Sequence, residues 1–309
     1  MPMSANEIRV VDPLLTSVVQ GFKLGNLVGD ALFPHVPVKT VAGKILSFGK
    51  EHFQLCDTLR APGSATKRIS FGFEGKPYAL ENHALEADLP REFQREADAT
   101  SHVDLGNRLA NLLMTRILRG LEVAQAKLAL DPANYDNKHQ LTLANDAKWS
   151  SDTADPKGDI EDAKEVIRKT VGIYPNVMLL SPSAYNCLKD HPTILERFKY
   201  TSSQSITTEI LQTLFDIPKI VVGMDIWADE DGKFHDTWGN NAILAYVAPV
   251  PTTAEEPSFG YTYVMEGHPL VEEAYEDKTH KSMVQGVTFE RAPVIAGMQA
   301  GFLFQGVKA

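Results

Sequence analysis

The sequence predicts an α+β fold in which an α/β block is inserted into a second, mainly β domain, and three observations predict it. Residues 176–223 place helical segments between two short apolar runs, the order expected of an α/β layer. A proline-free stretch over residues 98–130 predicts one long helix. Residues 259–305 contain alternating apolar and polar positions, and strands this late in the chain need earlier partners.

Composition indicates a globular chain with a sizeable core. The 309 residues are 43% hydrophobic and 23% charged, which suits one large or two medium domains. A net charge of −10 without any lysine or arginine run argues against a free-standing nucleic-acid binder. Cys56 and Cys187 suggest no disulfide framework, so a reducing compartment fits. Without a signal peptide or an apolar run near the roughly 18 residues of a span, we expect a soluble cytoplasmic product.

The first part of the chain predicts an arm followed by a long hairpin. Four prolines interrupt residues 1–40, which therefore read as extended. Lys44–Lys50 is one candidate strand, and Ile69, Phe71 and Phe73 alternate with polar or small residues in the other. Ala61–Ser64 (APGS) forms the tip between them. The hairpin has few large apolar residues for its length, so we expect it to need a partner surface.

The long helix is predicted from about Asp98 to Leu130, stopped by Asp131-Pro132. At 1.5 Å per residue it would be roughly 45–50 Å long, which exceeds the width of a compact domain and predicts a strut. Its apolar positions at helical spacing predict one buried face: Leu105, Leu109, Leu112, Ile117, Leu121, Ala124 and Leu128.

The block at 133–250 predicts alternating helices and buried strands. Asp159 is expected to cap a helix, and Ser181-Pro182 and Thr207 or Thr208 to begin the later ones. The predicted buried strands are Val177–Leu180, Ile220–Val222 and Ala242–Val247. Asp231-Gly232 predicts a tight turn.

The last segment returns to β structure. Phe259–Met265 alternates, Val284–Glu290 and Val294–Ala296 follow, and residues 301–306 read GFLFQG. The expected partners of these strands are the segment around Tyr78–Leu85 and the long helix. One domain is therefore expected to be discontinuous.

The sequence offers no motif that predicts chemistry. It lacks the phosphate-binding, nucleophile-elbow and metalloprotease patterns. The acidic segment Asp225–Gly232 resembles a calcium loop but fails in register, so a solvated hairpin is favoured. For Glu272, Glu273, Glu276 and Asp277 we favour an exposed or intersubunit acidic patch over a metal or acid–base cluster. Cys187 is expected to be a buried structural thiol. We therefore expect no catalytic, cofactor or metal site, and no enzyme.

Several short motifs, in this order, resemble the major capsid proteins of tailed bacteriophages with the Hong Kong 97-type fold. They run through nearly the whole chain: Val11–Leu15 with Ala31–Pro34, Phe48–Glu51, Ser181–Tyr185 with His191-Pro192, Phe198–Thr201, Trp238–Asn240 and Pro257–Thr262. The resemblance implies an N-terminal arm at 1–42 and an extended loop at 43–75 that reaches onto a neighbouring subunit. It also implies a peripheral domain at 76–132 and 255–309, with a spine helix, and an axial domain at 133–254.

The resemblance implies a shell protein that self-assembles as pentamers and hexamers around a double-stranded DNA genome. DNA would touch the inner face non-specifically, and the acidic balance fits a container that does not hold its genome tightly. Other implied partners are a portal, a maturation protease, a possible decoration protein and a separate scaffolding protein, because no helical scaffolding segment precedes residue 10. Assembly is expected in the bacterial cytoplasm, without a membrane. The candidate intersubunit residues are Lys50, Arg60, Lys67, Arg68, Glu272 and Glu276.

Two alternatives stay open at this point. An encapsulin-like compartment shell shares the fold and would show a cargo-binding groove, although the arm motif at Val11–Leu15 favours a phage protein. An unrecognised α/β hydrolase or transferase would show a deep pocket with convergent polar groups and would act as a monomer.

Overall fold

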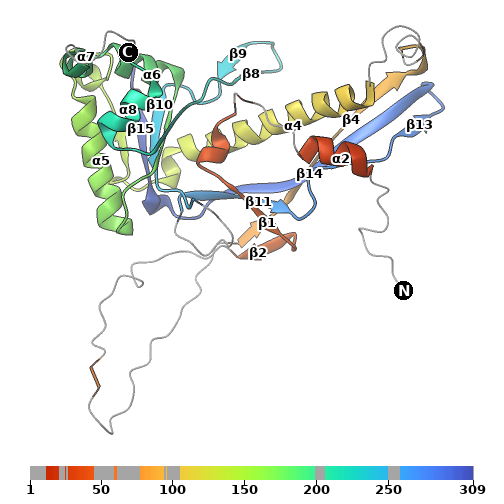
Figure 1. Cartoon of the computed structure of the whole chain (residues 1–309), viewed down its shortest axis with the longest axis horizontal. Helices are drawn as coiled ribbons and strands as arrows, with labels where there is room; N and C mark the ends of the chain where they lie inside the picture. The colour runs from red at the N-terminus through yellow and green to blue at the C-terminus, as the bar shows by residue number, and fades with distance from the viewer. Residues whose placement is uncertain are drawn as a thin grey trace.

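The protein is an α+β chain built on two sheets that are bridged by one long helix (Figure 1). This computed structural model describes residues 12–20, 25, 27–44, 59–60, 77–93, 95, 105–198, 206–249 and 258–308. Within these ranges, no helix is both long enough and apolar enough to cross a bilayer.

The first sheet has five strands in the order β5-β15-β10-β6-β7. Its strands are β5 (Gln140–Thr142), β6 (Val177–Leu180), β7 (Lys219–Val222), β10 (Asn241–Ala245) and β15 (Gly301–Gln305). Helices α5 (Pro156–Val171), α6 (Pro182–Asp190), α7 (Pro192–Phe198) and α8 (Thr208–Phe215) gather beside it (Figure 1). All four residues of β6 are buried, as expected of a central strand. These elements confirm the predicted α/β block.

The helix starts in this block follow from local capping chemistry. The Ser181 hydroxyl accepts a hydrogen bond from Ala184 N at 3.2 Å, with Pro182 in the first turn, as predicted. The prediction for α5 was wrong by one turn, because Asp155 is the cap and accepts from Gly158 N. Asp159 lies inside the helix and accepts a hydrogen bond from the Trp149 ring nitrogen at 2.9 Å.

The last strand also differs from its prediction. β15 pairs with β10 and β5, and not with the segment around Tyr78–Leu85. The first four residues of β15, GFLF, are buried, because the strand lies inside a sheet that is covered on both faces. The ring of Phe304 lies 5.2 Å from that of Trp149 in the core of this block. The C-terminal segment from residue 260 onward therefore contributes strands to both sheets.

The second sheet has six strands and carries the predicted late β structure. β1 (His35–Val38), β11 (Gly260–Met265), β14 (Ser282–Ile295) and β12 (Leu270–Val271) follow one another, and β13 (Tyr275–Asp277) and β4 (Glu81–Pro90) also pair with β14. The β4–β14 ladder runs from Glu81↔Arg291 to Pro90↔Ser282, which confirms the expected partner segment. Beside this sheet, β2 (Ala42–Lys44) pairs with β3 (Pro77–Ala79).

Helix α4 (Leu105–Leu130) runs alongside β14 and reaches the five-stranded block (Figure 1). Its 26 residues span roughly 39 Å at 1.5 Å per residue, so it is a strut as predicted, although residues 98–104 lie outside the described ranges. The predicted face was wrong at Leu112, which is 50% exposed. The buried face includes Ala110, Leu113 and Met114, because small and flexible side chains let the helix approach β14 closely.

The remaining elements are α2 (Pro13–Gln20), the 3-10 turns η1 (Gly29–Ala31), η3 (Pro132–Asn134), η4 (Asn145–Ala147) and η5 (Met298–Ala300), and the hairpin of β8 (Ile226–Ala228) and β9 (Phe234–Asp236). The Asp231-Gly232 turn is confirmed, with Gly232 at φ +78°. Of the predicted hairpin at 43–75, only residues 43–44 and 59–60 are described, so its structure and the domain limits around it stay predictions.

Candidate assembly surfaces

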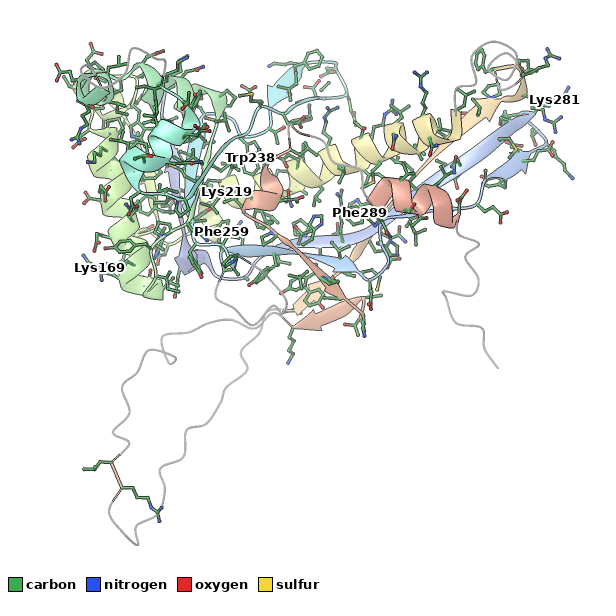
Figure 2. All side chains as sticks on the ribbon, viewed as in Figure 1. Lys169, Lys219, Trp238, Phe259, Lys281 and Phe289 are labelled. Carbon is green, nitrogen blue, oxygen red and sulfur yellow. The ribbon has the colours of Figure 1, made fainter. Side chains whose placement is uncertain are left out.

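A buried carboxylate on α4 holds together three distant parts of the chain. Glu122 is 2% exposed, and its Oε1 accepts hydrogen bonds from Val28 N at 3.0 Å and from the Trp238 ring nitrogen at 2.7 Å. Its Oε2 accepts from Gly29 N at 2.8 Å. Trp238 lies just before β10, beside the end of α4 (Figure 2). We call Glu122, Val28, Gly29 and Trp238 the Glu122 node.

Close packing around the node depends on two glycines. A Cβ on Gly29 would lie 2.0 Å from the Gln125 side-chain oxygen and 2.7 Å from Glu122. A Cβ on Gly223 would lie 2.1 Å from the Trp238 ring. Both separations are far below van der Waals contact, so any larger residue would displace the arm or the indole.

Gln125 extends the node into the six-stranded sheet. It is fully buried, and its side-chain nitrogen donates to Asp30 at 3.2 Å and to the Thr262 hydroxyl at 3.0 Å. The Thr262 hydroxyl donates to the carbonyl of Phe33 at 3.0 Å. The arm segment 28–33 is therefore fixed to α4 and to β11 by its backbone.

The electrostatics of the node reflect two opposing effects. Burial raises the pKa of Glu122, because the charged carboxylate loses its hydration. The three donated hydrogen bonds pull the pKa down, and the nearby charge of Asp30 pushes it up. The net result is a pKa above the ordinary value, so the carboxylate is held in place at a cost in solvation.

Strands β2 and β3 flank residues 45–76 in the chain, and an aromatic stack joins their ladder to the six-stranded sheet. The Tyr78 ring on β3 lies 4.2 Å from the Tyr263 ring on β11, with 9° between their planes. A Cβ on Gly43 would lie 2.7 Å from the Tyr78 ring, so β2 needs glycine there. The β2–β3 ladder is thus held against β11 by the Tyr78–Tyr263 stack.

The β8–β9 hairpin stands apart from both sheets and is fixed at its root (Figure 1). Asp225, which is 4% exposed, lies 3.3 Å from the Nε of Arg119 on α4. The Thr237 backbone N donates to the Asp225 carbonyl at 3.0 Å, and its hydroxyl to the carboxylate at 3.3 Å. On one face Trp227 stacks on His235, with 4.9 Å between ring centroids.

The candidate intersubunit residues do not gather in one place. Glu272 accepts a hydrogen bond from the Thr288 hydroxyl at 2.8 Å, and Glu276 forms an ion pair with Arg91, so both have partners within the subunit. Arg60 is exposed. Lys50, Lys67 and Arg68 lie in stretches that the structure does not describe. As intersubunit contacts, all six stay predictions.

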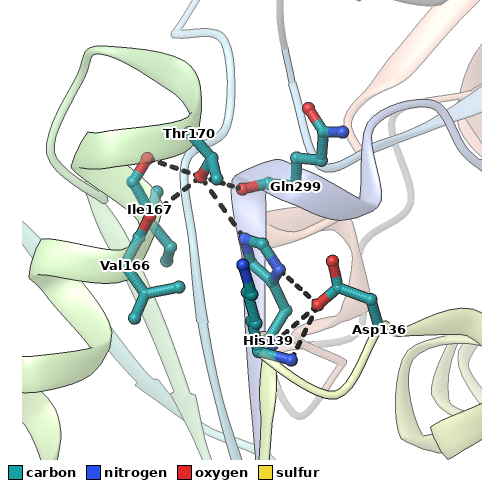
Figure 3. Close-up of polar contacts among 7 residues, drawn as sticks. Asp136, His139, Val166, Ile167, Thr170 and Gln299 are labelled. Carbon is teal, nitrogen blue, oxygen red and sulfur yellow. Dashed lines mark hydrogen bonds and ion pairs between the residues drawn. The ribbon is translucent and has the colours of Figure 1, made fainter.

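One buried polar cluster resembles a hydrolytic triad in its order of groups. His139 lies 2.7 Å from Asp136 through Nδ1 and 3.3 Å from the Thr170 hydroxyl through Nε2 (Figure 3). That hydroxyl also lies 2.9 Å from the carbonyls of Val166 and Ile167 within its own helix. His139 is 1% exposed, so no substrate reaches it. The cluster serves to join the β5 strand to α5.

In the described part of the chain, no three histidine, cysteine or acidic side chains gather as metal ligands would. An open cleft of about 440 Å³ lies between α2, arm residues 27–35 and α4, and its lining is mostly apolar. In it the Asp30 carboxylate lies 3.1 Å from the Nε2 of His35. Cys187 is half-buried and packs against the core of the five-stranded block, so the expected buried structural thiol is only partly buried.

Sequence reasoning missed the Glu122 node, although one signal for it was present. Glu122 is the only acidic residue between Leu105 and Leu130, and it follows directly after Leu121 on the buried stripe. A lone acid on an apolar helix face is rarely buried without specific partners. Its partners lie 93 and 116 positions away, which no local pattern identifies.

Comparisons with known proteins show similarity to phage major capsid proteins. A family model described as phage major capsid protein E matches residues 134–288. The major capsid protein of Burkholderia phage BcepMu is 34% identical over 308 residues, which cover 98% of each chain. The similarity therefore extends through the arm and both sheets.

Two solved structures extend the comparison. A phage-related protein from Bordetella bronchiseptica RB50 is 43% identical, with a TM-score of 0.85 over 97% of this chain and 98% of that one. The SrpI encapsulin complex from Synechococcus elongatus is 13% identical, with a TM-score of 0.54 over 93% of this chain and 90% of that one. The second likeness concerns the fold alone.

Proposed function

The chain belongs to the phage major capsid protein E family, and on that premise we propose that it forms the icosahedral shell around a phage genome as pentamers and hexamers. The observation that carries the proposal is the match to a phage major capsid protein over 98% of both chains. The family is structural rather than enzymatic. The subunit belongs to the virion capsid.

The phage assignment is favoured over an encapsulin-like compartment because the sequence identity to a phage protein is higher. An encapsulin shares the fold at 13% identity, whereas the phage relative shares 34% identity along the whole chain. An enzyme of α/β type would need an accessible set of convergent polar groups. The Asp136–His139–Thr170 cluster is closed to solvent at His139.

For the finer architecture, we propose Hong Kong 97-type roles. Residues 1–42 act as an arm, 43–75 as a loop that lies on a neighbour, 133–254 as the axial domain, and 76–132 with 255–309 as the peripheral domain. The rigid β2–β3 base supports the loop assignment, since it offers the loop an anchored exit. Because β15 pairs with β10, residues 301–305 of the proposed peripheral domain lie in the sheet of the proposed axial domain.

Other partners follow from the same proposal. A separate scaffolding protein, a portal and a maturation protease would act during assembly in the host cytoplasm, and a decoration protein would bind afterwards. Packaged double-stranded DNA would meet the inner face without sequence preference. The net charge of −10 supports weak contact with the genome, because each phosphate contact adds affinity.

Negative-stain electron microscopy of the purified chain, expressed with and without a scaffolding protein of the same phage, tests the proposal. Closed shells, or rings of five and six subunits, are expected. A monodisperse monomer under every condition would rule out self-assembly.

A further inference from the structure

The β8–β9 hairpin carries an apolar face that its own subunit leaves uncovered. Residues directly opposite on a two-stranded ladder share a face, so the pairs Ile226↔Asp236 and Ala228↔Phe234 place three apolar side chains together. Phe234 is 69% exposed and Ile226 is 45% exposed. Met224, just before β8, is 62% exposed. These residues define the hairpin face.

An uncovered apolar face of this kind is typical of a protein–protein contact. Single exposed apolar residues are ordinary on protein surfaces, but several on one fixed element mark an interaction site. Isolated two-stranded hairpins are marginally stable alone, but here the Asp225–Thr237 contact closes the root of the hairpin and the Asp225–Arg119 contact joins that root to α4. The hairpin face is therefore presented rigidly. Within the layer of a shell, the surfaces beside each subunit are copies of the same chain.

Charge narrows the choice of partner segment. Beyond its root the hairpin carries four acids against one lysine: Asp229, Glu230, Asp231 and Asp236 against Lys233. A complementary segment must be basic and apolar, in a chain whose net charge is −10. Residues 45–76 meet both requirements. Five cations there (Lys50, Arg60, Lys67, Arg68 and Lys76) outnumber three acids (Glu51, Asp57 and Glu74), and Ile69, Phe71 and Phe73 recur at every second position.

We propose that the β8–β9 hairpin of one subunit is the docking surface for residues 45–76 of a second copy. The inference rests on the proposed function and specifies which surface receives the loop. Half of residues 45–76, fully extended, spans at most roughly 50 Å, which sets the limit of the reach onto a neighbour. In this arrangement, the apolar side chains of residues 45–76 cover the hairpin face. The cations of the same segment lie against the hairpin acids Asp229, Glu230, Asp231 and Asp236.

The apolar part is tested by Phe234→Ser with Phe234→Leu as the matched control. Phe234 is mostly exposed, so both subunits should unfold at the same urea concentration as the wild type. Assembled shells, counted by sedimentation and electron microscopy, should fall about tenfold or more for Phe234→Ser and persist for Phe234→Leu. Wild-type shell yield from Phe234→Ser would overturn the proposal.

The identity of the loop is tested by charge reversal. The double change Lys67→Glu/Arg68→Glu should reduce shell yield, and adding Glu230→Lys/Asp231→Lys should restore it. The control adds Asp146→Lys/Asp152→Lys, at exposed acids on another part of the subunit, and should restore nothing. Equal restoration by both pairs, or by neither, would overturn the assignment of this loop to this hairpin. Wild-type protein that forms no shells would instead refute the proposed function.

Discussion

Replacing Glu122 with glutamine tests whether the Glu122 node fixes the arm. The variant keeps the shape of the side chain but replaces one acceptor oxygen with an amide donor. Oε1 serves both Val28 N and Trp238, so a glutamine carbonyl in that position leaves Gly29 N facing another donor. Losing one buried hydrogen bond to a charged group and weakening two others should lower the free energy of unfolding by about 2 kcal/mol. A domain with about 5–15 kcal/mol of stability still folds after such a loss.

Urea unfolding followed by tryptophan fluorescence measures this directly, because Trp238 is part of the node. Glu196→Gln, at an exposed position on α7, is the matched control and should change little. Trp238→Phe removes one donor, and its effect should be non-additive with Glu122→Gln because both changes act on one bond. Equal unfolding midpoints for Glu122→Gln and Glu196→Gln would refute the reasoning.

Three further predictions concern pH, the buried face of α4 and the loop. Burial raises the pKa of Glu122 above 4.5, so its protonated form stabilises the fold at low pH, and that contribution is lost as pH rises through the folded pKa. The loss in free energy of unfolding caused by Glu122→Gln, relative to the wild type, should therefore be larger at about pH 5 than at about pH 8. A loss that does not change with pH would contradict this. Leu113→Ala should lower the free energy of unfolding in urea by about 2–5 kcal/mol and Leu112→Ala by less than about 1 kcal/mol, because Leu113 is 3% exposed and Leu112 is 50% exposed. Equal losses would show that the buried face of α4 is wrongly assigned. Deleting residues 59–66 should leave subunit unfolding unchanged but reduce intact shells by sedimentation, and an unfolded subunit would refute that assignment.

Local signals predicted much of the fold correctly. Ser181-Pro182 specifies a helix start by capping and by the fixed φ of proline, so neighbouring residues suffice to place it. The β6 strand is apolar at every position because helices and neighbouring strands surround it. The same logic predicted the Asp231-Gly232 turn, where glycine adopts φ +78°.

Features that depend on distant partners were not predicted. Leucine spacing alone placed Leu112 on the buried face, but the close approach of β14 selects Ala110 and Met114 instead. Strand β15 was assigned to the wrong sheet because its apolar pattern fits either core. The ion pair of Glu276 with Arg91 was not predicted either, because it follows only from the pairing of both β13 and β4 with β14.

A density map of assembled shells by electron cryomicroscopy tests the central claim most directly. The account predicts closed icosahedral shells in which residues 45–76 of each subunit lie on the β8–β9 hairpin of the next. Shells in which that segment folds back on its own subunit, or touches neighbours elsewhere while the hairpin face stays uncovered, would contradict it.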